Sequence, residues 1–528
     1  MKRRARRGVW VTVTLLLIAG AVLMERATRM TPYVRDQAVA ALNAKFASQV
    51  ELGSLQVSVF PRPEVIGEGV LLRYNGRTDA RPLLAVRGFS STAGMMGLWR
   101  KPLRLNTLDL DGLEITIPAG GLSPDDPADA SRSGRLAPPR PTTAPSRSGS
   151  QTLLIDRVVA RDATLEIASK DSSKLPRRFE IHNLDMTGLG DGAGSPFRAQ
   201  ITNPKPRGHI DTNGTFGPWQ TDNPRRTPIH GDYVLSRADL NTIKGIGGIL
   251  ASTGSYRGVL ERIDVSGRTD MPDFSVDTGG QPVPLTTRFN AVVDGTNGNT
   301  WLERVEARLR NTIIIARGAV VRAQDVKGRE ISLDVAIENG RLEDLLALAI
   351  KAVKPPMTGG VRINTHMVIP AGEESVIDKL QLAGEFELAH ARFSNLNVQN
   401  RINTLSRKGQ GDPPGADEGE SAVSRLRGRF VMRDAAIQFS RLTFAVEGAI
   451  VQLAGGYNLR SEAIDFSGEL LLDASLAEMT TGVRSVAARI VQPFFRRPGG
   501  GSKIPIRISG TRTNPTFGLD VRRTFLPG

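Results

Sequence analysis

Five histidines are the first residues to test for chemistry, because imidazole can ligate a metal ion or act as a general base. No two of them have the four-residue spacing that places two metal ligands on one face of a helix, and none lies in a His and Glu ligand pattern. We therefore interpret all five as surface or core residues and expect no metal or other cofactor. They are His182, His209, His230, His366 and His390.

Motifs for nucleophilic or phosphate chemistry are also missing. The chain has no Gly-x-Ser-x-Gly turn, no Gly-Lys-Ser/Thr loop and no cysteine, which removes thiolate nucleophiles and disulfides. The glycine-rich stretch 245–248 does not follow the dinucleotide-binding pattern, and the acidic pairs Asp125-Asp126 and Glu373-Glu374 fall in loop contexts. Sugar-processing sites usually carry aromatic platforms, and this chain has 4 Trp and 5 Tyr. We expect no enzymatic activity.

The net charge of +15 indicates an anionic partner or surface. Outside the first eight residues, Lys and Arg are spread along the chain and do not alternate with aromatic residues. This pattern is not typical of a nucleic-acid interface, so we expect no nucleic-acid partner. We interpret the excess as a solvated basic surface close to anionic lipid headgroups.

The N-terminal residues predict a membrane anchor. A basic head, residues 1–8, precedes the uncharged apolar run 9–24, whose 16 residues would rise about 24 Å as a helix, near the lower limit for one span. The positive-inside rule then keeps the N-terminus in the cytoplasm and exports the rest of the chain. The residues that we assign to the bilayer include Trp10, Leu15, Leu16, Leu17 and Ile18.

A cleaved signal peptide is the alternative to this anchor. Ala19-Gly20-Ala21 has the small-x-small pattern of a cleavage site, which would lie after Ala21. Because 22–24 continue the apolar run beyond that site, we favour the uncleaved anchor. Both interpretations export the remainder.

From residue 50 onward the dominant pattern is apolar-polar alternation, which is typical of strands in antiparallel sheets with one apolar face. Asp111-Gly112 lies between two such runs and predicts a hairpin turn. Frequent turn signals favour an all-β sheet system over a βαβ fold. The apolar positions that we select as candidates are Leu55, Val57, Val59, Leu103, Leu105, Leu333, Val335, Phe444, Val446, Ile504, Ile506 and Ile508.

Few segments depart from this alternation. Apolar spacings of three and four residues predict helices at 31–49, 238–250, 341–354 and 475–494. A stretch rich in Pro, Ser and Arg, 119–151, predicts a disordered loop, and 407–421 predicts a shorter flexible one.

The apolar sheet face has two interpretations that periodicity alone does not separate. It could pack as the interior of a sandwich. Alternatively, a long sheet could curl into an incomplete tube whose aliphatic, aromatic-poor wall is shared between core packing and a ligand with hydrocarbon tails. With 5% aromatic residues, this wall would suit acyl chains.

Short motifs near both ends resemble the AsmA-like family of envelope proteins, which includes TamB and YhdP. The resemblance covers about residues 1–118 and 440–528, whereas the middle shares only the strand pattern. The motifs are the segments 50–55, 59–63, 67–70, 102–105 and 108–113 near the N-terminus, and 456–459, 504–511 and 514–517 near the C-terminus.

The resemblance implies a single-pass protein of the bacterial inner membrane, with a mostly β, elongated and curled antiparallel-type sheet groove in the periplasm and a few amphipathic helices. The expected organisation is a cytoplasmic head 1–8, an anchor 9–24, an AsmA-like N-terminal β region 31–118 with a leading helix, the loop 119–151, a middle β region 152–406 with helices, the loop 407–421, and an AsmA-like C-terminal β region 422–528 containing the helix 475–494.

The function implied by the resemblance is the binding, and the conduction towards the outer membrane, of phospholipids whose tails lie against the apolar candidates. Inner-membrane lipids are then the expected partners, and outer-membrane or periplasmic proteins are further candidates. The alternative is an assembly or scaffolding factor for outer-membrane proteins that has no lipid conduit.

Overall fold

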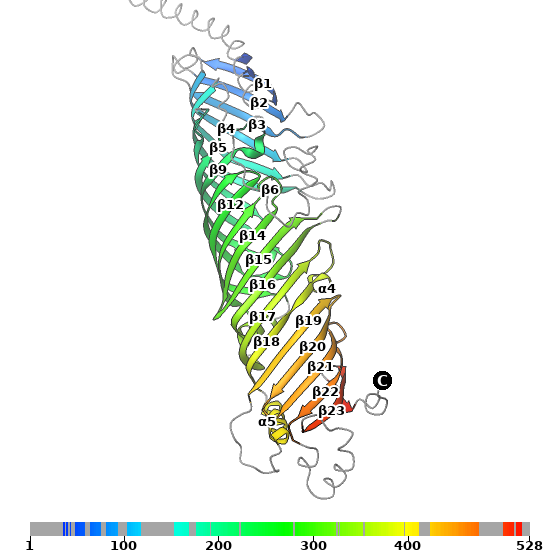
Figure 1. The fold of residues 1–528 in the computed structure, drawn as a ribbon. Helices are drawn as coiled ribbons and strands as arrows, with labels where there is room; N and C mark the ends of the chain where they lie inside the picture. The colour runs from blue at the N-terminus through cyan, green and yellow to red at the C-terminus, as the bar shows by residue number, and fades with distance from the viewer. Residues whose placement is uncertain are drawn as a thin grey trace, which may run out of the picture.

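The alternating pattern folds this chain into one long β-sheet that curls along its length without closing (Figure 1). The prediction of a mostly β, curled antiparallel-type sheet with few helices is therefore confirmed. This computed structural model describes residues 35–36, 39–40, 43, 48–58, 64–74, 81–92, 103–117, 153–167, 176–190, 192–220, 223–277, 280–323, 326, 328–351, 354–394, 396–410, 423–474, 500–511 and 514–519.

The described part of the sheet has 24 strands. The first twelve are β1 (Ser48–Ser58), β2 (Glu64–Tyr74), β3 (Leu84–Thr92), β4 (Leu103–Ile117), β5 (Leu153–Ile167), β6 (Arg177–Leu189), β7 (Ser195–Pro204), β8 (Arg207–Phe216), β9 (Pro228–Asp239), β10 (Ile246–Gly247), β11 (Ile249–Val259) and β12 (Arg262–Val276). The others are β13 (Val283–Val293), β14 (Thr300–Leu309), β15 (Thr312–Arg322), β16 (Arg329–Arg341), β17 (Met357–Ile369), β18 (Gln381–Phe393), β19 (Ser424–Arg433), β20 (Ala436–Val446), β21 (Ala449–Asn458), β22 (Ala463–Leu472), β23 (Ser502–Thr511) and β24 (Pro515–Leu519).

Strands pair with their neighbours in chain order, and almost every pair is antiparallel. The short β10 pairs with β12, so β9 pairs directly with β11. The exception in direction is the parallel pair β4–β5, in which Leu103 is opposite Leu153 and Ile117 is opposite Ile167. Ile117 and Leu153, which flank the predicted loop, therefore lie at opposite ends of this pair; the loop itself lies outside the described residues.

The predicted hairpin at Asp111-Gly112 is wrong. Strand β4 runs unbroken through these residues. Gly112 has a positive φ of +58°, and Asp162 on β5 has a similar φ of +51°. The register of β4 with β5 is the same before and after Gly112, so the positive φ is a local irregularity within the strand and not a turn. Pairing with β3 on one side and β5 on the other keeps this Asp-Gly pair within the strand.

The helices are α3 (Leu342–Ala349), α4 (Val376–Lys379) and α5 (Leu396–Gln410), with 3₁₀ turns η1 (Pro224–Arg226) and η2 (Leu240–Thr242). The prediction over 341–354 is confirmed for Leu342–Ala349, and the helix ends there because the chain is already extended at Ile350. Of the segment 31–49, the described residues 35–36, 39–40 and 43 are helical, and Ser48 already belongs to β1. The predicted anchor 9–24 and the predicted helix 475–494 lie outside the described residues.

Two predictions on local structure are wrong. Residues 238–250 are not one helix: they comprise the end of β9, the turn η2, β10 and the start of β11, as their three glycines would favour. The predicted flexible loop 407–421 begins inside α5, since Arg407 to Gln410 are helical. Residues 411–422 lie outside the described residues.

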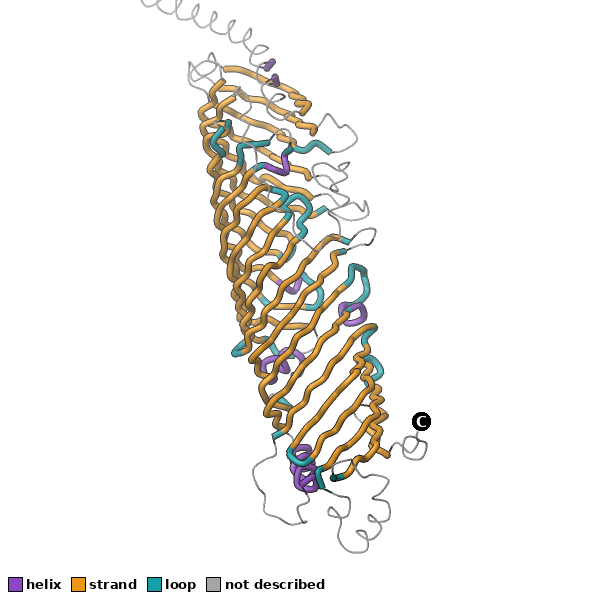
Figure 2. The backbone as a smooth tube through the Cα atoms, viewed as in Figure 1, coloured by secondary structure: helices purple, strands orange, loops and turns teal. Residues whose placement is uncertain are grey.

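The longer connections are concentrated along one edge formed by strand ends, which we call the first rim. It contains the start of β1 and the ends of β16 and β18, where α3 and α5 follow. The opposite edge, the second rim, carries the turns β11–β12 and β15–β16. Figure 2 shows helices and loops at the strand ends rather than within the sheet. Because strands alternate in direction, every second connection returns to the same rim.

Candidate functional site: the inner face of the sheet

One face of the sheet is apolar from β1 to β24, and we call it the inner face. Residues directly opposite each other in register share a face, so Val57 on β1 shares its face with Val65 on β2. By the same rule, Leu333 on β16 shares its face with Met367 on β17, and Phe466 on β22 shares its face with Ile508 on β23. The apolar pattern of each strand thus continues from one strand to the next across the whole sheet.

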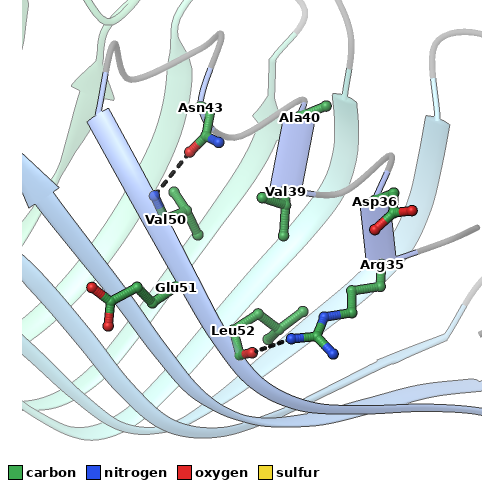
Figure 3. A pocket seen from close by; sticks show the side chains of 8 residues that line it. All are labelled: Arg35, Asp36, Val39, Ala40, Asn43, Val50, Glu51 and Leu52. Atoms are coloured by element: carbon green, nitrogen blue, oxygen red, sulfur yellow. Dashed lines mark hydrogen bonds between the residues drawn. The ribbon is translucent and has the colours of Figure 1, made fainter. Parts of the chain in front are cut away.

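Exposure distinguishes the inner face from the outer face. Val65 is 5% exposed, whereas its neighbour Ile66, which points the other way, is 46% exposed. Side chains crowd together on the concave side of a curled sheet and spread apart on the convex side. The inner face is therefore the concave one. In Figure 3, Val50 and Leu52 point toward the helical residues Val39 and Ala40, whereas Glu51 points away.

The candidates predicted from sequence fall on this face wherever the structure describes their side chains. Leu55, Val57 and Val446 are buried, at 9%, 8% and 7% exposed. The half-buried ones are Leu105, Leu333, Val335, Phe444, Ile504, Ile506 and Ile508. Leu103 is placed by its register opposite Leu153, and Val59 lies outside the described residues.

Aromatic rings on the inner face stand opposite glycines, a feature that the sequence analysis missed. Phe89 is opposite Gly67, and Phe386 is opposite Gly428. A Cβ on Gly428 would lie 2.8 Å from the Phe386 ring, so that ring lies over the glycine. The same pairing joins Phe197 to Gly214, Tyr256 to Gly231, Tyr233 to Gly254, Phe289 to Gly267, Phe430 to Gly384 and Phe466 to Gly455.

Four phenylalanines form a row near the C-terminal end of the inner face. The ring centroids of Phe386 and Phe430 lie 6.1 Å apart, and those of Phe430 and Phe439 lie 6.5 Å apart. Phe439 and Phe466 lie 5.8 Å apart although β21 runs between their strands, because Gly455 occupies the intervening position. Tilted rings at these separations attract one another weakly.

A cluster of hydroxyl groups interrupts the apolar surface between β8 and β13. The Thr212 and Tyr256 hydroxyls lie 2.8 Å apart, and the Tyr233 and Ser252 hydroxyls lie 3.1 Å apart. Burial raises the pKa of Tyr233 and of Tyr256, although hydrogen bonds to Ser252 and Thr212 oppose the shift. These groups satisfy one another, so the cluster remains compatible with a largely apolar wall.

The outer face carries cross-strand ion pairs, and by register it also carries the buried apolar cluster of Val292, Trp301, Ala319 and Val321. Arg157 on β5 donates hydrogen bonds to Asp185 on β6, and Arg507 on β23 donates to Asp465 on β22. The hydrogen bond from Arg157 lowers the pKa of Asp185. Exposed pairs of this kind stabilise a fold by at most about 1 kcal/mol each. Their contribution is to keep this face solvated and to oppose slippage of the register.

Helices on the first rim cover parts of the inner face. In α3, Leu342, Leu345 and Leu346 pack with Ile337 and Val361. In α5, Ile402 and Leu405 pack with a cluster that includes Val446, Phe444 and Ile504.

Hydrogen bonds hold α5 in this position. The Ser406 hydroxyl donates to the carbonyl of Glu447 at 2.8 Å, and the Gln399 side-chain oxygen accepts from the backbone N–H of Phe393 at 3.0 Å. Three of the predicted candidates, Phe444, Val446 and Ile504, therefore lie under or beside a helix, whereas Leu333 and Val335 lie outside that cluster.

A cavity of about 560 Å³ lies at the N-terminal end of the inner face (Figure 3). Arg35 donates a 2.9 Å hydrogen bond to the carbonyl of Leu52, and the Asn43 side chain accepts one of 2.8 Å from the N–H of Val50. These bonds attach the helical residues to β1. The cavity is lined by Arg35, Asp36, Val39, Ala40, Asn43, Val50, Glu51 and Leu52.

Within the part of the chain that the structure describes, no cluster of three or more His, Asp or Glu could hold a metal ion. No helix among these same residues has the length and apolarity required to cross a bilayer. Three arginines on the inner face, Arg177, Arg322 and Arg329, were also missed by the sequence analysis. The sequence did contain a signal for their position, because each arginine falls on the apolar positions of its alternating strand, as in Arg329-x-Ile331-x-Leu333.

The fold and face define a class: an open, curled, mostly antiparallel sheet with a largely apolar inner face and an outer face that carries ion pairs. Comparison of the chain with protein-family models, curated proteins and solved structures finds no match.

Proposed function

We propose that this protein is anchored in a bacterial inner membrane through residues 9–24, and that its periplasmic sheet binds phospholipids and conducts them towards the outer membrane, as the resemblance to the AsmA-like family implies. The observation that carries the proposal is the largely apolar inner face, which continues from strand to strand across the described sheet while the sheet stays open. An open trough lets acyl chains lie against the wall while headgroups remain in water.

The energetics support this function. Each methylene that leaves water for an apolar wall gains about 0.8 kcal/mol, so a lipid with two acyl chains needs continuous apolar cover to move between membranes at a useful rate. At about 4.8 Å per strand, a sheet of this size extends roughly 110 Å. Transport along such a wall needs no catalytic residue.

The test compares two lysine substitutions on neighbouring residues of β16. Val335 lies on the inner face, and Ala336 lies on the outer face of the same strand. The full chain is purified from membranes, and co-purified phospholipid is quantified by mass spectrometry after photo-cross-linking. Val335→Lys should lower the cross-linked lipid several-fold, whereas Ala336→Lys should leave it unchanged. A wild-type chain that carries no phospholipid would refute the proposal.

A specific observation favours the assembly-factor alternative. Among the described strands β24 pairs only with β23, and its side chains Phe517 and Leu519 are 68% and 56% exposed. An unpaired strand edge can accept a strand from another protein. This alternative predicts a stable protein partner in pull-downs and an unchanged distribution of lipids between the membranes when the protein is deleted.

A further inference from the structure

Six hydroxyl groups form a band on the inner face, which we call the hydroxyl belt. They lie on β8, β9, β11, β12 and β13, which pair in this order and whose residues are all described. Each member is separated by at least three residues from both ends of its strand, so the belt runs along the floor of the trough, away from the rims. Its members are Thr212, Tyr233, Ser252, Tyr256, Thr269 and Thr287.

Register places the members of the hydroxyl belt side by side. Ser252 is opposite Thr269, and Thr269 is opposite Thr287. Thr212 is opposite Tyr233, whose hydroxyl lies 3.1 Å from that of Ser252. Side chains directly opposite each other have Cβ atoms about 4.5–5.5 Å apart, so these hydroxyls form a connected band.

Glycines allow both phenols of the belt to lie low on the trough floor. Tyr256 is opposite Gly231, and a Cβ on Gly231 would lie 2.6 Å from the Tyr256 hydroxyl. Tyr233 is opposite Gly254, and its hydroxyl reaches Gly267 on the following strand, where a Cβ would lie 2.9 Å from it. The two hydroxyls therefore lie over positions that carry no side chain.

The direction of the hydrogen bonds follows from the backbone carbonyls that the belt contacts. The Thr212 hydroxyl donates a 2.8 Å hydrogen bond to the carbonyl of Asp232, and a carbonyl oxygen can only accept. Because this bond uses the single hydroxyl proton of Thr212, the Tyr256 hydroxyl, 2.8 Å away, donates the bond between the two side chains. The Tyr256 oxygen keeps its lone pairs as acceptors.

The second phenol of the belt has the same arrangement. The Ser252 hydroxyl donates a 3.1 Å hydrogen bond to the carbonyl of Arg268, so Tyr233 donates to Ser252. The hydroxyls of Thr269 and Thr287 lie 2.7 Å apart and share one proton. Five of the six hydroxyl protons are thus used within the wall, whereas the phenol oxygens still present lone pairs. The belt therefore accepts hydrogen bonds more readily than it donates them.

We propose that the hydroxyl belt binds the hydrogen-bond donors of a phospholipid headgroup, an ammonium or a hydroxyl group, while the acyl chains lie on apolar positions beside it. Ester carbonyls only accept hydrogen bonds, so they are poor ligands for this band. Met271 and Leu285 continue the inner face on one side of the belt, and Ile263 and Val293 continue it on the other. The proposal rests on the proposed lipid-binding function and adds a selectivity for headgroups that carry donors.

The experiment uses the delipidated full chain in detergent, to which an equimolar mixture of three phospholipids with identical dimyristoyl chains is added. Phosphatidylethanolamine carries ammonium donors, phosphatidylglycerol carries hydroxyl donors, and phosphatidylcholine carries neither. Bound lipid is quantified by mass spectrometry after the excess is removed. The first test variant, Tyr233→Phe with Tyr256→Phe, removes both phenol oxygens and keeps the rings.

A second test variant and a matched control accompany the first. Thr269→Val with Thr287→Val removes the paired hydroxyls on β12 and β13 and preserves the branched shape of both side chains. The control, Ser255→Ala with Ser266→Ala, removes two hydroxyls that lie 3.2 Å apart on the outer face of β11 and β12. Thermal unfolding of all three proteins checks that they are folded.

We expect wild type and the control to bind at least one donor-bearing lipid about tenfold more than phosphatidylcholine. Each test variant should bind a similar total of lipid with this preference reduced several-fold. Enrichment of only one donor-bearing lipid supports the proposal and shows whether the ammonium or the hydroxyl group is bound. Equal binding of the three lipids by wild type, or an unchanged preference in both test variants, would overturn the inference while leaving lipid binding intact. A wild-type chain that binds none of the three would instead contradict the proposed function.

Discussion

At the scale of single residues, the informative positions of the inner face are the few that carry a polar or charged side chain where the pattern is apolar. Tyr233 and Tyr256 place hydroxyls on an apolar wall, and each finds a hydroxyl partner within 3.1 Å. Arg322 and Arg329 place charge there, and Arg329 donates hydrogen bonds to the backbone carbonyls of Gly298 and Asn297. Buried polar groups that are satisfied locally are tolerated, whereas those that are not require an external partner.

The two buried tyrosines predict a pH dependence on the alkaline side. Folding raises the pKa of Tyr256 above the ordinary value of 10.0, so the folded state keeps a proton that the unfolded state loses. The stability contributed by the neutral phenol is complete below pH 10 and declines as the pH rises through the folded pKa. Spectrophotometric titration should show Tyr233 and Tyr256 ionising later than exposed tyrosine. Tyr256→Phe should abolish one delayed step, and an unchanged titration curve would contradict this assignment.

At the scale of elements, glycine and aromatic residues act as pairs across strands. A ring that lies over a glycine covers backbone and occupies less of the trough than a ring that projects from the wall. The Phe386 ring lies over Gly428, and Phe439 and Phe466 meet across Gly455, so the row of phenylalanines stays in lateral contact. We infer that these pairs keep the inner face apolar while their rings project little from the sheet.

Gly428→Ala tests this pairing. The new Cβ would lie 2.8 Å from the Phe386 ring and 3.1 Å from Leu442, so the ring must move, and we expect a loss of about 1–3 kcal/mol in unfolding free energy. Gly88→Ala is the matched control, because its Cβ would meet nothing closer than 3.9 Å. Chemical denaturation of both variants measures the difference. Equal stability of the two would show that Phe386 does not depend on the glycine.

Helix α5 limits where lipid can lie on this wall. It covers the cluster that contains Phe444 and Ile504, whereas Leu333 and Val335 lie on strands outside that cluster. Helix α3 packs on Ile337 and Val361, at the rim end of these same strands. Leu333 and Val335 are therefore not among the described residues on which either helix packs.

At the scale of the whole molecule, the sheet is nearly one-dimensional. Each strand pairs with its immediate neighbours in the chain, and the packing clusters stay local to a few adjacent strands. The parallel pair β4–β5 and the direct pairing of β9 with β11 are the departures from this order. Such connectivity resembles that of repeat proteins, in which stability is a sum over neighbouring units.

This connectivity predicts unfolding in several steps. Hydrogen exchange under increasing denaturant should expose β23 and β24 before the central strands, because β24 is short and has one partner among the described strands. Trp301 on β14 is buried at 3% exposed, so its fluorescence should change later than exchange at β24. Mass spectrometry of the exchanged peptides measures the exchange of β23 and β24 separately from that of the central strands. Coincident transitions across the whole sheet would contradict this view.

The alternation of apolar and polar residues was sufficient to predict the sheet, its antiparallel type and the face on which Leu333, Val335 and Ile506 lie, because side-chain direction in a strand has a period of two. The same local pattern failed at Asp111-Gly112 and over 238–250. In both places the neighbouring strands decided the conformation, through pairing that local turn or helix signals do not contain.

The sequence by itself determined which residues share a face, because alternation is a property of each strand alone. Only the tertiary structure decided that the face is concave, that glycines stand opposite aromatic rings, and that Arg322 lies opposite Arg329. These features depend on register between strands and on the curl accumulated over many of them. Both arise from contacts between residues that are far apart in the chain.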